Sequence, residues 1–88
     1  MGKYERIYDD IMNSRHDKNI NFKDLCNLLE KLGFTLRIKG DHFIYYKEGI
    51  IGIIDLQPSK KDHAKAKPYQ VKQVRILFQE NNIGKEGL

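Results

Sequence analysis

The amino-acid sequence predicts an α+β fold in which two helices precede three strands and one helix follows them. Apolar residues recur at helical spacing near both ends of the chain and alternate with period two in the middle. A chain of 88 residues has room for one domain, because such chains bury only about 60% of the surface exposed on unfolding.

The first predicted helix is defined by an apolar stripe whose polar neighbours lie on the opposite side. The members of the stripe are Tyr4, Ile7, Tyr8, Ile11 and Met12. Residues 13–19 are polar and unpatterned, and we expect them to form a connection.

The second predicted helix covers about residues 22–32. Asn21 is a good capping residue, and Asp24 lies near the positive end of the helix. Gly33 adopts left-handed backbone angles easily and therefore ends the helix.

Three strands follow, and the first runs from Phe34 to Lys39 with alternating apolar and polar residues. Aromatic and β-branched residues predict a second strand over 42–46, and an isoleucine-rich run predicts a third over 50–56. A polar loop over 57–67 then leads to a final helix that starts at Pro68, and the tail from about Asn82 is expected to fray.

The second and third predicted strands carry apolar side chains on both faces. Two helices on one face of the sheet leave the other face bare. Two explanations remain open: the first helix covers the second face, or another chain does.

Positive charge is concentrated in the second half of the chain. The net charge is +4, and six basic residues lie between Lys60 and Arg75 with only Asp62 opposing them. Such a patch suits a polyanion such as nucleic acid, although a solvated lysine-rich loop has the same composition.

The single cysteine, Cys26, indicates a reducing compartment and falls on the apolar stripe of the second helix, where we expect a packed thiol. No apolar stretch reaches the about 18 residues of a membrane span, and we expect a cytoplasmic protein. His16, His63 and the other candidate ligands lack the paired spacing of a zinc site, so no metal or cofactor is predicted.

Four segments of the chain are familiar: FKDLCNLLEKLGF, RIKGDHFIYYKEG, IIDLQP and KAKPYQVKQVR. The order helix, three-stranded meander, helix is that of the double-stranded-RNA-binding fold, and the segments resemble the HicA family of toxins from bacterial toxin-antitoxin pairs. The resemblance divides the single domain 1–88 into an N-terminal helical extension (1–20), a HicA-like core (21–83) and a tail (84–88).

The resemblance implies a small toxin that cleaves mRNA, stops translation and is neutralised by a HicB-type antitoxin. Members of the family carry their active-site histidine in a Gly-Ser-His motif. Gly40 and His42 match this motif, whereas Asp41 stands where serine is commoner.

The residues also fit this chemistry without the family. RNA cleavage needs no metal when the neighbouring 2′-hydroxyl is the nucleophile. One histidine can transfer the protons, and a few cations can neutralise the charge on the phosphate. The carboxylate of Asp41 can orient His42, which would favour cleavage, or repel the RNA backbone, which would oppose it. The sequence does not decide which effect on activity is larger.

We therefore predict an endoribonuclease in which His42 is the general acid or base. The predicted phosphate-binding residues are Lys39, Lys60, Lys61, Lys65, Lys67, Lys72 and Arg75. Two alternatives remain, an RNA-binding module without catalysis and a protein-interaction domain whose exposed sheet pairs with another chain.

Overall fold

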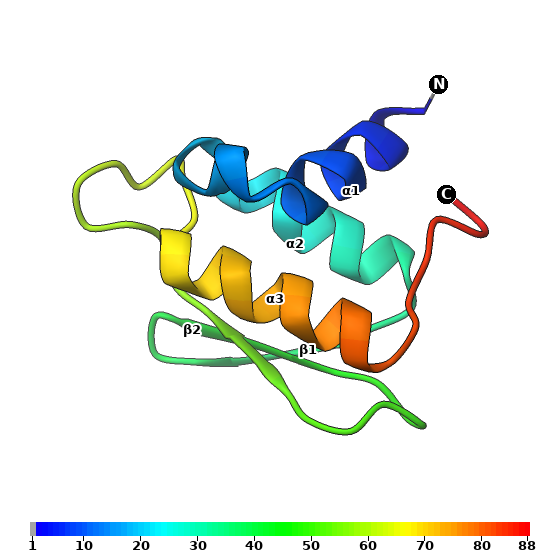
Figure 1. The fold of residues 1–88 in the computed structure, drawn as a ribbon. Coiled ribbons are helices and arrows are strands. Elements are labelled where there is room, and N and C mark those ends of the chain that lie inside the picture. Colours follow the sequence, from blue (N-terminus) through cyan, green and yellow to red (C-terminus); the bar gives the residue numbers. More distant parts are fainter. Residues whose placement is uncertain (1) are drawn as a thin grey trace.

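The computed structural model describes residues 2–88 and confirms the predicted α+β architecture, an α-β-β-β-α core preceded by a helix (Figure 1). In chain order the elements are α1 (Lys3–Met12), the 3-10 helix η1 (Ser14–Asn19), α2 (Phe22–Lys31), β1 (Thr35–Lys39), β2 (His42–Tyr46), β3 (Ile54–Leu56) and α3 (Pro68–Glu80). None of the helices in this part of the chain is long and apolar enough to cross a membrane.

The strands form an antiparallel sheet in the order β1-β2-β3. Figure 1 shows α2 and α3 together on one face of this sheet, with α1 on the far side of the two helices. Helix α1 contacts both α2 and α3, and α3 contacts β3. The molecule is therefore built in three layers.

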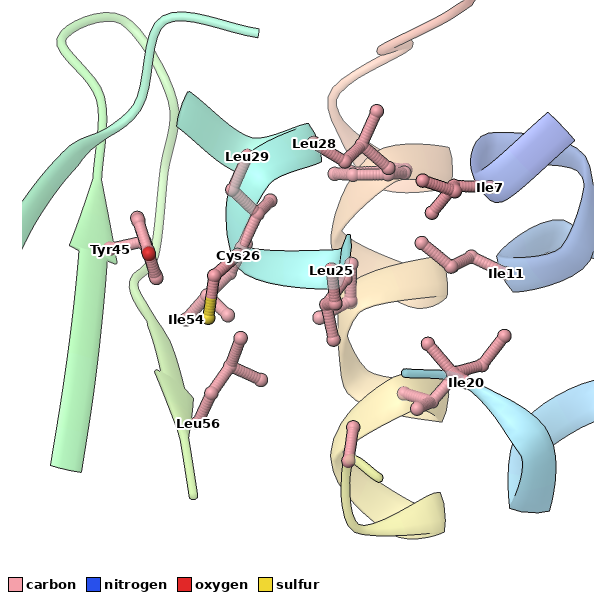
Figure 2. Close-up of a cluster of buried hydrophobic side chains, with 14 of the residues drawn as sticks. Ile7, Ile11, Ile20, Leu25, Cys26, Leu28, Leu29, Tyr45, Ile54 and Leu56 are labelled. Atoms are coloured by element: carbon pink, nitrogen blue, oxygen red, sulfur yellow. The ribbon is translucent and has the colours of Figure 1, made fainter. Parts of the chain in front are cut away.

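Helix α2 lies in the middle of the core and is buried on two sides (Figure 2). Its Cys26 faces the sheet, where Tyr45 and Leu56 project toward the helix, whereas its Leu25 points toward the side of Ile11 from α1. Leu25, Tyr45, Leu56 and Ile11 are all completely buried. Each fully buried side chain of this kind contributes about 1.5–3 kcal/mol to stability.

The capping residues predicted for α2 act as expected. The side-chain Oδ1 of Asn21 accepts a hydrogen bond from the backbone N–H of Asp24 at 2.9 Å. Gly33 has a φ of +93°, the left-handed conformation that ends the helix.

One of the two explanations for the apolar second face of the sheet is wrong, because α1 does not cover it. The apolar stripe of α1 packs instead against α2, whose leucines are buried, and against α3. Residues directly opposite in an antiparallel pair share a face, so the register defines an outer face of the sheet. This outer face comprises Thr35, Arg37, Lys39, His42, Ile44, Tyr46 and Asp55.

The third strand is shorter than predicted, because it begins at Ile54 rather than at Ile50. Gly49 and Gly52 both have positive φ angles, +87° and +101°, which turn the backbone out of the sheet direction. Ile51 and Ile53 are consequently 88% and 64% exposed.

The predicted connection 13–19 is mostly the 3-10 helix η1, which is tied to α3 by one arginine. The guanidinium of Arg75 donates to both carboxylate oxygens of Asp17 at 2.7 and 3.1 Å and to the carbonyl of Ile11 at 2.9 Å. These bonds join η1, α1 and α3.

The expectation of a frayed tail is wrong. The hydroxyl of Tyr8 donates to the carbonyl of Ile83 at 2.7 Å, and Lys85 pairs with Asp9 at 2.8 Å. Leu88 also packs against the core. The tail is therefore tied to α1, and its apolar residues Ile83 and Leu88 pack against the core.

Candidate active site

His42 is the first residue of β2 and follows directly on the turn at Gly40 and Asp41. Gly40 has a φ of +62°, which lets the chain reverse between β1 and β2. The imidazole belongs to the outer face of the sheet, and its side chain is 43% exposed. It is held by the sheet and open to solvent.

Asp55 of β3 holds one side of the ring, with its Oδ1 at 2.8 Å from Nδ1 of His42. An ionised carboxylate only accepts hydrogen bonds, so this contact favours the tautomer with the proton on Nδ1. The lone pair of the neutral ring is then on Nε2, the nitrogen directed away from Asp55.

Sequence reasoning missed Asp55. The available signal was a charged residue within an otherwise apolar strand, flanked by Ile54 and Leu56. Its partner could not be read from the sequence, because the pairing depends on the register of β3 against β2.

The other nitrogen, Nε2, faces two polar side chains. The side-chain amide nitrogen of Gln57 lies 3.3 Å from it, and Oδ1 of Asp41 lies 3.7 Å away. The same amide donates to Oδ2 of Asp41 at 3.1 Å. An amide N–H of Gln57 therefore lies against Nε2 of the imidazole.

Gln57 is itself fixed by two contacts. Its Oε1 accepts from Nζ of Lys67 at 2.8 Å, and its backbone N–H donates to Oε1 of Gln70, a residue only 4% exposed. A chain of contacts thus runs from His42 through Gln57 to Lys67 at the start of α3. Gln57 is a second residue that sequence reasoning missed, since it lies in a predicted loop.

A cavity of about 410 Å³ opens beside the imidazole; we call it the His42 cleft. It is lined by Lys39, Gly40, Asp41, His42, Ile44 and Asp55. Lys39 lies directly opposite His42 in the sheet register and so brings a cation to the same face. Lys39 and Lys67 therefore supply positive charge to the surroundings of the ring.

Most of the other predicted phosphate-binding lysines gather at a second cavity of about 610 Å³, the lysine hollow. It is lined by Lys18 and by residues 59–62 and 65–69, which include Lys60, Lys61, Lys65 and Lys67. Lys72 is exposed on α3 outside both cavities.

Arg75 has to be removed from the predicted phosphate-binding set. Its side chain is only 11% exposed, and its guanidinium is paired with Asp17. The hydrogen bonds that Arg75 donates to Asp17 also raise the pKa of the guanidinium. The residue is a structural cation that holds η1 on α3.

His16, His63 and Cys26 line neither cavity. His16 and His63 are exposed, and Cys26 is buried with its thiol pKa raised by desolvation. Within residues 2–88, no three or more His, Cys, Asp or Glu side chains are grouped so that they could hold a metal ion.

Comparison with known proteins agrees with the resemblance stated above. A family model described as HicA toxin of bacterial toxin-antitoxin matches residues 22–79, which cover α2, the three strands and most of α3. Comparisons with curated proteins and with solved structures gave no match. A toxin of this kind has an antitoxin as its partner. The chain therefore belongs to the HicA family of toxins of bacterial toxin-antitoxin systems.

Proposed function

We propose that this toxin is a metal-independent endoribonuclease that cleaves mRNA and thereby inhibits translation, with His42 as its catalytic imidazole. The observation that carries the proposal is the 2.8 Å contact between His42 and Asp55 at a cleft that also holds Lys39. An oriented imidazole beside cations is what cleavage by a 2′-hydroxyl requires.

In this mechanism the 2′-oxygen forms a bond to phosphorus while the bond from phosphorus to the 5′-oxygen breaks. The products are a 2′,3′-cyclic phosphate and a free 5′-hydroxyl. Nε2 of His42 takes the proton of the 2′-hydroxyl while water protonates the leaving oxygen, or the protonated ring gives its proton to the leaving oxygen while water takes that of the 2′-hydroxyl. Lys39 and Lys67 neutralise charge that develops on the phosphoryl oxygens.

Gln57 has a further role in this proposal. Its amide faces Nε2 of His42 in the free protein. When the 2′-hydroxyl takes that place, the amide N–H is free to donate to a phosphoryl oxygen. Gln57 would thus exchange one acceptor for another as the substrate binds.

The phosphate-binding surface consists, in this proposal, of the accessible lysines in the His42 cleft, in the lysine hollow and on α3. They are Lys39, Lys60, Lys61, Lys65, Lys67 and Lys72. A strand of RNA contacting several of them would bind with strong salt dependence, because each neutralised phosphate releases counterions.

We further propose that the antitoxin is of the HicB type and binds the outer face of the sheet. Ile44 lines the His42 cleft and Tyr46, two residues further along β2, is 44% exposed. These apolar groups have no covering element within residues 2–88. A partner seated on them would also cover His42.

Replacing His42 with alanine should abolish RNA cleavage and leave the fold intact. Loss of one general acid or base costs about 10²–10⁴ in rate. Cleavage of a labelled single-stranded RNA in excess EDTA measures this, with His16→Ala as the control and circular dichroism to verify folding. Wild-type cleavage by His42→Ala, or activity that only added metal restores, would contradict the mechanism.

Replacing Asp55 with asparagine should lower the turnover rate by about 10²-fold or more, because an amide no longer selects the Nδ1–H tautomer. The KM for RNA should stay nearly constant, since Asp55 positions the imidazole rather than binding the substrate. Single-turnover rates and binding measured on the same variant separate the two effects. An altered KM with an unchanged rate would assign Asp55 to substrate binding instead.

Replacing Asp41 with serine should raise the cleavage rate by about threefold to tenfold at low salt, since the carboxylate lies beside Nε2 where the phosphate must approach. The gain should shrink as salt screens the repulsion. Rates of Asp41→Ser and of the distant control Glu48→Ser are compared between about 0.05 and 0.5 M salt, over which the screening length falls from about 14 Å to about 4 Å. A loss of activity would show that Asp41 positions Gln57 and His42.

Replacing Tyr46 with alanine should weaken antitoxin binding by about 30-fold, the effect of losing a buried aromatic contact of about 2 kcal/mol. Calorimetric titration with a HicB-type antitoxin measures the change. Ile76→Ala, at an exposed position of α3, serves as the control. Unchanged affinity of the Tyr46 variant would place the antitoxin elsewhere.

A further inference from the structure

The lysine hollow is a built cavity rather than the surface of a loose loop. Two backbone hydrogen bonds tie the segment 59–67 to the start of α2. The N–H of Ala66 donates to the carbonyl of Ile20 at 2.9 Å, and the N–H of Phe22 donates to the carbonyl of Ala64 at 2.8 Å. Ala66 is 1% exposed. These hydrogen bonds hold the backbone from which the lysine side chains of the segment extend.

The N-terminal segment contributes one wall of the hollow. Lys18 comes from η1, which lies outside the residues 22–79 that match the family. Its neighbour Asp17 is anchored by Arg75. The backbone at Lys18 is therefore held against the hollow by an interaction that the family core alone does not contain.

The charge of the hollow calls for an anionic ligand. Five lysines line it, and Asp62 is the only carboxylate among its lining residues. Two of the ammonium groups have neutral partners, since Lys65 donates to Asn19 at 3.2 Å and Lys67 to Gln57 at 2.8 Å. Their charges remain uncompensated.

An aromatic ring completes the hollow. Tyr69 is among the lining residues and is 57% exposed, so its ring is accessible to a planar group. The volume of about 610 Å³ falls in the range of small-molecule sites. Cations around an exposed aromatic ring suit a nucleotide, which combines a phosphate with a stacking base.

The hollow adjoins the catalytic histidine. Lys67 lines it and also donates to Gln57, whose amide lies 3.3 Å from Nε2 of His42. We propose that the lysine hollow binds one nucleotide of single-stranded RNA flanking the cleavage point, with its base on Tyr69 and its phosphate on Lys18 and neighbouring lysines. The proposal rests on the function proposed above and assigns it a single-stranded substrate, since a paired base cannot enter a cavity.

The test is fluorescence anisotropy with a labelled eight-nucleotide RNA whose 2′-hydroxyls are methylated, so that it cannot be cleaved. Tyr69→Ala should raise the Kd about tenfold, which corresponds to about 1.4 kcal/mol of stacking, while Tyr69→Phe stays close to wild type. Lys18→Ala should weaken binding about threefold and reduce the slope of log K against log salt by about 0.7.

Two matched controls accompany these variants. Lys31→Ala removes an exposed lysine of α2 that lines neither cavity, and Tyr46→Ala removes the exposed aromatic of the outer face. Both should bind the RNA like wild type. Circular dichroism checks folding, and Tyr69→Leu replaces Tyr69→Ala if the alanine variant unfolds.

Wild-type affinity of both the Tyr69 and the Lys18 variants for the RNA would overturn the proposal. Weaker RNA binding by Tyr46→Ala alone would also overturn it, because it would place the flanking nucleotide on the outer face of the sheet. Equal binding of the same RNA as a duplex, independent of Tyr69, would overturn it too. A cleavage assay runs in parallel. Tyr69-dependent binding without cleavage would refute the endoribonuclease and keep the hollow, whereas cleavage with Tyr69-independent binding would refute only the hollow.

Discussion

The helices cover only one face of the sheet, so the register of its strands decides which side chains enter the core and which lie on the outer face. Tyr45 is completely buried between β2 and α2, and its hydroxyl donates to Glu30 of that helix at 3.0 Å. A slip of one residue would move Tyr45 to the outer face and turn His42 inward. The large aromatic side chain therefore fixes the position of the imidazole three residues earlier, because the two occupy opposite faces of one strand.

The same register assembles the surroundings of His42 from segments far apart in sequence. Lys39 lies opposite His42 on β1, Asp55 reaches the ring from β3, and Gln57 arrives just beyond that strand. Gln57 connects this group to α3 through Lys67. Consequently the sheet lines the cleft, whereas the start of α3 holds Gln57 beside it, so movement of α3 against the sheet would displace both the Gln57 amide and Lys67.

Local patterns were sufficient to predict the elements and the position of His42, since a turn glycine followed by an aromatic strand is visible in the sequence itself. Asp55 and Gln57 escaped prediction because their roles depend on strand pairing and on the path of a loop. The third strand was made too long because an isoleucine run shows apolar character but not where Gly52 bends the backbone. Arg75 was counted as an accessible cation because the sequence of α3 alone does not reveal that Asp17 of η1 pairs with it.

The N-terminal segment shows how charge is redistributed by an added layer. Helix α1 covers the side of α2 turned away from the sheet, and η1 then brings Asp17 to Arg75. This ion pair, with side chains 11% and 20% exposed, removes one cation of the basic stretch from solvent. The adjacent residue Lys18 returns a cation at the lysine hollow. The extension thus neutralises one cation on α3 and adds another at the lysine hollow, so the charge available to an anionic ligand lies in the cavity that Lys67 also lines.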